Sequence, residues 1–258
     1  MRENRVKAEL LRGQVQVGTW LHTLCAPELP QILATSGFDF VNIDMEHSSF
    51  SLKAVGDLCF AAQQAGIVPV VRPPDRQRHL ISRPLDNGAL GIYAPHVDTV
   101  EDAQDVVDAV KFPPLGHRGS QPPSVNTSFR SFDAGEYMPR ANAETMVIVQ
   151  LESAQALRNM DAILALSGVD GAVIGRGDLA ADLGLGGQRG HARIDRAVED
   201  MVAACGRHGK IPGLMVLGLD DGAAWIERGV RMVTYASEML MIREAGRTAV
   251  ERLRQTVT

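Results

Sequence analysis

The sequence has few of the residues that build disulfide frameworks, thiolate metal sites or membrane spans. Its three cysteines, Cys25, Cys59 and Cys205, lie far apart and form no C-x-x-C pair, which argues against a disulfide scaffold and a thiolate zinc site. No apolar run approaches the roughly 20 residues that cross a bilayer, so we expect no membrane partner. The charged amino-terminal stretch MRENRVKAELLRG lacks the apolar core of a signal peptide, and we expect a cytoplasmic protein.

Positive charge is also scarce. The formal net charge is -5, and the arginines and lysines are scattered, without the basic stripe that neutralises a nucleic acid backbone. The chain has only four lysines, all expected at helix ends or in loops: Lys7, Lys53, Lys111 and Lys210. Imine chemistry on a barrel needs a lysine that projects from a strand into the lumen. We therefore expect neither nucleic acid binding nor a Schiff-base mechanism.

Two short glycine motifs invite functional readings that their context does not support. The first predicted strand leads into HTLCAPELP rather than a G-x-G-x-x-G turn, and the glycines of Gly184–Gly190 follow a helix, so we read them as a loop. Arg176-Gly177-Asp178 matches an adhesion tripeptide, but that role needs an exported loop. Neither dinucleotide binding nor adhesion is expected.

Short β-branched runs alternate with helical patterns along the whole chain of 258 residues. The predicted strands are Val15–Leu21, Phe38–Glu46, Ile67–Arg72, Gly91–Val97, Thr145–Glu152, Val169–Gly175, Ile211–Leu217 and Arg231–Ser237. The predicted helices are Pro27–Ser36, Leu52–Ala65, Val100–Val110, Ala154–Leu166, Ile194–Arg207, Asp220–Arg228 and Glu238–Gln255. Eight such units predict one (β/α)₈ TIM barrel over residues 1–258, with an open doubly wound sheet as the alternative. The connection Lys111–Glu144 is rich in proline, glycine and serine, and loops of this length are usually functional.

The second strand carries polar residues on one face only. Alternation sends Asn42, Asp44 and Glu46 toward the lumen and the apolar residues between them toward the helices. Buried carboxylates need cations or donors, so these residues either serve a site or form an ion-pair network with arginines of neighbouring strands.

Other candidates follow the strand ends. His47 stands beside two carboxylates that could orient its ring for proton transfer. Arg72 ends the third strand and could neutralise an oxyanion or pair with Asp44 or Glu46. His22 and His96 also follow or end strands, and either could line the pocket.

The fifth and sixth strands predict a metal site. Gln150 and Glu152 share a face, Glu152 lies at the carboxyl end, and Asp178 follows the next strand, where catalytic groups of barrels gather. Two carboxylates without cysteine or paired histidine suit Mg²⁺ or Mn²⁺. Taken alone, Asp178 in DLAAD also suits a helix N-cap.

Several motifs, in this order and spacing, resemble the HpcH/HpaI family of metal-dependent pyruvate aldolases. They are GTWLHTLCAPELPQILATSGFDFVNIDMEH, VVRPP, PLDNGALGIYAPHV, KFPPLGHRG, VIVQLES and VIGRGDLAADLG, and they cover Gly18 to Gly184. The resemblance implies a class II aldolase that reversibly cleaves a 4-hydroxy-2-oxo acid to pyruvate, or a related 2-oxo acid, and an aldehyde. It also implies a TIM barrel whose last helix is exchanged between subunits of a homo-oligomer, a trimer or a hexamer.

The same resemblance implies roles for individual residues. The metal ligands fall on Glu152 and Asp178, for Mg²⁺, Mn²⁺ or Co²⁺, and the site arginine falls on Arg72. The base falls on His47 with Asp44 as its partner. Further substrate-binding positions are Gln150 and the backbone amides of Gly177 and Asp178, while Asp86 helps to order the site of the neighbouring subunit.

The chain departs from the family pattern at Gly175-Arg176-Gly177-Asp178, where Gly-Pro-Ala-Asp is usual. Arg176 adds a charge there, and glycine loosens the amides. HSSF after the histidine and SEMLMIRE near the end also differ. Two alternatives stay open: a lyase for acyl-CoA thioesters of the malyl-CoA or citramalyl-CoA type, and a catalytically silent barrel that binds a 2-oxo acid.

Overall fold

Eight parallel strands close into a barrel in the computed structural model, which describes residues 1–120 and 123–255. The strands follow one another around the barrel in chain order, and β8 pairs with β1. They are β1 (Gln16–Leu21), β2 (Phe40–Asp44), β3 (Val68–Arg72), β4 (Gly91–Ala94), β5 (Met146–Leu151), β6 (Gly171–Ile174), β7 (Ile211–Val216) and β8 (Met232–Ser237). The predicted (β/α)₈ fold is confirmed, and the strands are shorter than predicted, so Glu46 and His96 lie beyond strand ends.

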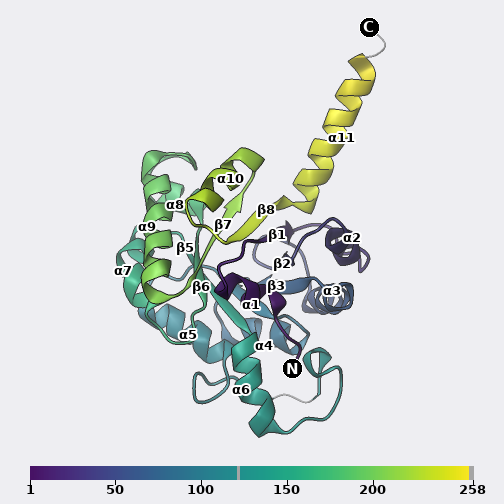
Figure 1. The fold of residues 1–258 in the computed structure, drawn as a ribbon, viewed down its shortest axis with the longest axis vertical. Helices are drawn as coiled ribbons and strands as arrows, with labels where there is room; N and C mark the ends of the chain where they lie inside the picture. Colours follow the sequence, from purple (N-terminus) through teal and green to yellow (C-terminus); the bar gives the residue numbers. More distant parts are fainter. Residues whose placement is uncertain (121–122, 256–258) are drawn as a thin grey trace.

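Helices surround the barrel (Figure 1). They are α1 (Arg5–Leu11), α2 (Leu29–Thr35), α3 (Leu52–Ala65), α4 (Arg78–Asp86), α5 (Val100–Val110), α6 (Ala134–Glu144), α7 (Ala154–Leu164), α8 (Arg176–Asp182), α9 (Ala192–His208), α10 (Leu219–Glu227) and α11 (Glu238–Gln255). Every predicted helix is present, but α1, α4, α6 and the short α8 were not among the predicted helices. Both α4 and α6 contain an internal proline, which masks a helical pattern.

The long connection was wrongly predicted to lack secondary structure. Within its described part it contains α6 and a short 3₁₀ turn at Val125–Thr127; residues 121 and 122 lie outside the described part. Asp133 caps α6 by accepting a hydrogen bond from the backbone N–H of Glu136. This local cap, rather than a long apolar stripe, marks the start of the helix.

Two apolar layers position the site. Val41 and Ile43 of β2 pack outward against the helices, as alternation predicts. The lumen is filled by larger side chains from alternate positions, including Phe40, Val70 and Ile148. The barrel is therefore a packed core, and within it the buried Asn42 amide donates a hydrogen bond of 2.9 Å to Oγ1 of Thr234.

Helix α1 closes the amino-terminal end of the barrel. Its Val6 and Leu10 join the lumen cluster, and the ammonium group of Lys7 lies 2.8 Å from the Asp170 carboxylate. Lys111 donates to the Thr145 carbonyl at the same end, and burial lowers its pKa to about 8. These two buried lysines lie at the start of β5 and β6, opposite the strand ends that carry catalytic groups in barrels, which agrees with the expected lack of imine chemistry.

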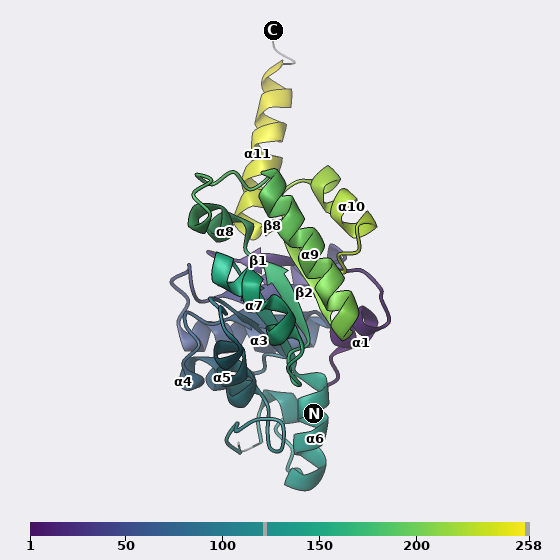
Figure 2. The same cartoon turned by 90° about the vertical axis from the view of Figure 1, so that its left-hand side faces the viewer.

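Helix α11 projects away from the barrel instead of packing along it (Figures 1 and 2). Exposed apolar side chains follow one of its faces: Met239, Ile242, Val250 and Leu253. In the described part of the chain, no helix has the length and apolar character that crossing a membrane requires.

We expect Gly18→Ala to destabilise the barrel, because a Cβ at this position of β1 would overlap the ring of Phe40 on β2. Overpacking of this kind costs about 1–3 kcal/mol. Urea denaturation measures the loss. The matched control is Gly206→Ala in α9, where the new methyl meets no atom within 4 Å and helix propensity favours alanine. Equal stability of the two variants would contradict this account.

Candidate active site

A buried ion pair joins the carboxyl ends of β2 and β3. Asp44 and Arg72 are direct partners in the strand register, and two hydrogen bonds of 2.8 Å link the guanidinium to the carboxylate. Burial alone would disfavour the charged carboxylate, but hydrogen bonds from His22 and Arg72 outweigh it and hold the pKa of Asp44 far below its usual value. The lumen position of Asp44 is as predicted, and its pairing with Arg72 is the ion-pair alternative that the sequence left open.

Glu46 extends this network across the barrel mouth. Its carboxylate lies 3.1 Å from the Arg72 guanidinium and 2.8 Å from Nε2 of His96. Nδ1 of His96 lies 2.9 Å from Glu152, so this ring bridges the carboxylates that follow β2 and β5. His96 adopts a left-handed backbone with φ of 53°, which is uncommon for a residue other than glycine.

Glu152 directly follows β5 and is 5% exposed. Its Oε1 accepts hydrogen bonds from His96, and its Oε2 accepts one from the Gln150 amide. A Cβ at Gly175, just beyond β6, would lie 2.6 Å from Oε2 of Glu152. The carboxylate can therefore occupy its position only because residue 175 has no side chain. Burial raises the pKa of Glu152, and the negative charge of Asp178 raises it further.

Asp178 lies in the first turn of α8, whose N-cap is Gly175. The N-cap reading of Asp178 is therefore wrong. Its carboxylate faces the cavity and makes no hydrogen bond or ion pair within the described residues. Its negative charge contributes to the raised pKa of Glu152, so the two predicted metal ligands lie within electrostatic range of each other.

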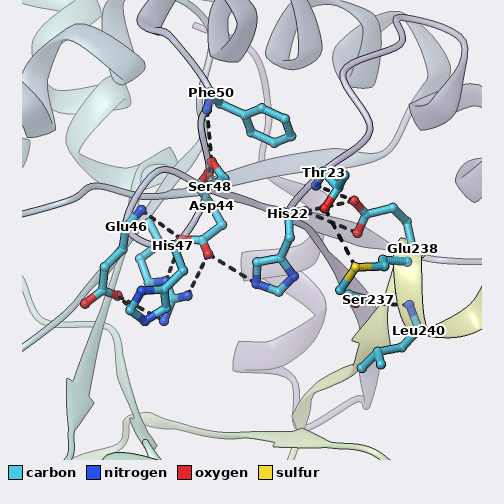
Figure 3. A network of polar contacts seen from close by, with 12 residues as sticks. His22, Thr23, Asp44, Glu46, His47, Ser48, Phe50, Ser237, Glu238 and Leu240 are labelled. Atoms are coloured by element: carbon cyan, nitrogen blue, oxygen red, sulfur yellow. Dashed lines mark hydrogen bonds and ion pairs between the residues drawn. The ribbon is translucent and has the colours of Figure 1, made fainter.

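The predicted pairing of His47 with Asp44 does not form. His47 lines the cavity with its side chain 61% exposed, and its nearest carboxylate oxygen is that of Glu46, at 3.7 Å. Nε2 of His22 instead lies 3.1 Å from Oδ2 of Asp44, the oxygen that also accepts a hydrogen bond from Arg72 (Figure 3). His47 follows β2 after a turn, so the strand alternation does not control its direction.

A cavity of about 740 Å³ opens at this end of the barrel. Its wall includes Trp20, Tyr93, Gln150, Met215 and Arg189. The sequence did not single out Trp20 and Tyr93, because apolar residues occupy both faces of β1 and β4. Arg189 belongs to the glycine-rich loop, where no periodicity indicates direction.

Arg176, which stands where the family usually has proline, adds little net charge to the cavity. The guanidinium pairs with Asp221 at 2.7 Å and donates to the Met215 carbonyl at 2.9 Å. Its charge is therefore balanced within the chain. Asp86 lies elsewhere: it ends α4, pairs with Arg118 at 2.7 Å, and does not line this cavity.

The donor set fits a hard divalent cation held by two carboxylates and completed by substrate and water. Asp178 makes no ion pair within the described residues, and burial, with a smaller effect of the Asp178 charge, raises the pKa of Glu152. The buried Oε1 of Gln150 also lacks a hydrogen-bond partner. Within residues 1–120 and 123–255, no three His, Cys, Asp or Glu side chains gather to hold a metal by themselves.

A closed parallel barrel with ionised side chains at the carboxyl ends of its strands has the arrangement of a TIM-barrel enzyme. The family model described as HpcH/HpaI aldolase/citrate lyase matches residues 16–245. The chain belongs to this family, which confirms the resemblance seen in its motifs.

Relatives support this assignment. The chain is 35% identical to a 2-keto-3-deoxy-L-rhamnonate aldolase of Klebsiella pneumoniae subsp. pneumoniae, over 92% of this chain and 90% of the relative. It is 34% identical to a hydroxypyruvate/pyruvate aldolase of Roseobacter denitrificans, over 98% of each. The crystal structure of an HpcH/HpaI aldolase from Desulfitobacterium hafniense DCB-2 matches with a TM-score of 0.91 and 30% identity, over 96% of each chain.

We expect Arg72→Gln to destabilise the protein by about 3–5 kcal/mol at neutral pH, because it leaves a buried carboxylate without its main partner. The folded-state pKa of Asp44 lies below the unfolded value near 4, so the contribution of the pair is present above about pH 4 and is lost as the pH falls further. Denaturation at neutral and acid pH should show the difference between the proteins shrinking in acid. Arg12→Gln breaks an exposed pair and should cost under about 1 kcal/mol; a similar loss in both variants would count against the buried pair.

Proposed function

We propose that the chain is a metal-dependent class II aldolase. The reaction is the reversible cleavage of a 4-hydroxy-2-oxo acid into pyruvate, or a related 2-oxo acid, and an aldehyde. The observation that carries this proposal is the placement of Asp178 in the wall of the cavity and of Glu152 directly behind Gly175 and Gln150, which also line it. Relatives named as aldolases for 2-oxo acids, similar over nearly the full chain, support it.

We propose that Glu152 and Asp178 hold the cation, which is Mg²⁺, Mn²⁺ or Co²⁺. When bound, the cation would stabilise negative charge on the 2-oxo group, an effect of several kcal/mol. Gln150 keeps Glu152 in place through its amide and presents its free carbonyl oxygen to the same region. The backbone amides of Gly177 and Asp178, in the first turn of α8, would bind the substrate carboxylate.

Arg72 has a fixed position for a role in charge stabilisation. Asp44 and Glu46 hold it from two sides, and its guanidinium lies 4.4 Å from the ring centroid of Trp20. A guanidinium that is held in advance requires little rearrangement when negative charge develops beside it. Cleavage also needs a base for the C4 hydroxyl proton, and two histidines line the cavity: His47, as predicted, and His22.

We also propose that α11 is exchanged between subunits of a homo-oligomer, a trimer or a hexamer. On the apolar face of α11, Met239, Ile242 and Val250 are 46–59% exposed. Exposed apolar side chains also lie between β1 and α2 (Leu24), on α2 (Ile32), and just before and at the start of α10 (Leu217 and Leu219). A helix from a second copy would cover them, and the assembly would bring Asp86 toward a neighbouring site.

We expect Glu152→Gln and Asp178→Asn each to lower chelator-sensitive turnover at least about a hundredfold, because each removes a charged cation ligand. The assay pairs pyruvate or oxaloacetate with a panel of aldehydes, with each metal and with EDTA. Calorimetry should show weaker Mn²⁺ binding in both variants. Glu101→Gln, on the exposed side of α5, is the control.

Three results would change the assignment. Normal EDTA-sensitive turnover in both variants would refute the metal site. Tight binding of CoA in calorimetry would favour an acyl-CoA lyase. Binding of metal and pyruvate without solvent exchange of the pyruvate methyl protons would favour a silent barrel.

We expect Ile242→Asp to dissociate the assembly, because it places a charge in the apolar face of α11. Light scattering after gel filtration measures the mass. Thr248→Asp adds the same charge to the opposite face of the helix and should leave the mass unchanged. An unchanged mass in both variants would argue against helix exchange.

A further inference from the structure

His22 occupies the place beside Asp44 that the sequence predicts for His47. Its Nε2 lies 3.1 Å from the carboxylate, and its side chain is 20% exposed, against 61% for His47. Both histidines line the cavity. Figure 3 shows His22 directed at Asp44, while His47 lies beside Glu46 at the other end of the network.

Three contacts fix the orientation of His22. Its ring stacks on Trp20 with centroids 5.6 Å apart and planes 23° apart, and Trp20 meets Tyr93 edge to face. The backbone N–H of His22 donates to the Glu238 carboxylate at 3.0 Å. The third contact is Asp44. A base held in this way loses little conformational freedom when substrate arrives.

The carboxylate contact also determines which ring nitrogen is basic. Asp44 already accepts two hydrogen bonds from Arg72, and an ionised carboxylate only accepts. Nε2 therefore carries the proton of the neutral ring and donates it to Asp44. Nδ1 remains the acceptor, and it has no hydrogen bond within the described residues. His47 lacks such an arrangement, because its distance to Glu46 is 3.7 Å.

We propose that His22, oriented by Asp44, is the residue that transfers the proton in the aldol reaction of this chain; this inference rests on the proposed function. In cleavage, Nδ1 of His22 accepts the C4 hydroxyl proton while the electrons of the C3–C4 bond pass into the enolate of the 2-oxo acid, and the aldehyde leaves. The imidazolium then returns the proton to C3. Asp44 stabilises the imidazolium.

The test compares His22→Asn with His47→Asn in the metal-loaded, full-length protein. His22→Asn should lower kcat about 10²- to 10⁴-fold, with the KM for the 2-oxo acid changed by less than about threefold. It should slow deuterium exchange at C3 of pyruvate to a similar degree and abolish the fall in kcat on the acid side of the pH profile. The charged groups nearest His22 are Asp44, Arg72 behind it, and Glu238 at its backbone, and none changes in either variant.

The matched control is His208→Asn, which breaks a surface histidine–aspartate contact of 3.0 Å to Asp161 and should leave all three readouts unchanged. Should His22→Asn fold poorly, His22→Ala with added imidazole provides a second test, in which rescue of exchange supports the proposal. The proposal would be overturned if His22→Asn kept both the deuterium exchange of pyruvate and the fall in kcat at acid pH, while His47→Asn lost both. A wild type that neither exchanges pyruvate protons nor cleaves any substrate would overturn both this inference and the proposed function.

Discussion

The ion pair between Asp44 and Arg72 is the interaction on which the organisation of the site depends. Strand pairing of β2 and β3 brings the two residues together at a depth where neither charge is tolerated alone. Once paired, the carboxylate retains acceptor capacity that His22 uses, and the guanidinium retains a donor that Glu46 uses. One buried pair therefore fixes a histidine on one side and a chain of carboxylates on the other.

Polar groups at the two ends of the barrel differ in whether they have hydrogen-bond or ion-pair partners. At the amino-terminal end, Lys7 and Lys111 are neutralised by Asp170 and backbone carbonyls under α1, so their polar groups are satisfied. At the carboxyl end, within residues 1–120 and 123–255, the buried Oε1 of Gln150 has no hydrogen-bond partner and the exposed Asp178 makes no ion pair. This asymmetry agrees with a stabilising end and a reactive end in barrels of this type. The unsatisfied polar groups mark where a ligand would be recognised.

Much of the fold follows from sequence because strand alternation and unit count are regular. The outward positions of Val41 and Ile43 and the lumen position of Asp44 come directly from the period of a strand. His47 follows a turn after the strand end, so the partner predicted for it was wrong. The approach of His22 to Asp44 depends on β1 and β2 being neighbours and on the stack with Trp20, which no local pattern reports. Helices that contain proline, such as α4, were missed because local propensity opposes them.

Gly175 contributes to the site because it has no side chain. The Glu152 carboxylate occupies the volume that any side chain at this position would fill. An acid just after β5 and a glycine just after β6 are thus one structural unit, although they are 23 positions apart in the sequence. In descendants of this chain, the two positions should be inherited or lost together. A glycine at this point of a related barrel would then indicate that its partner acid still packs against it.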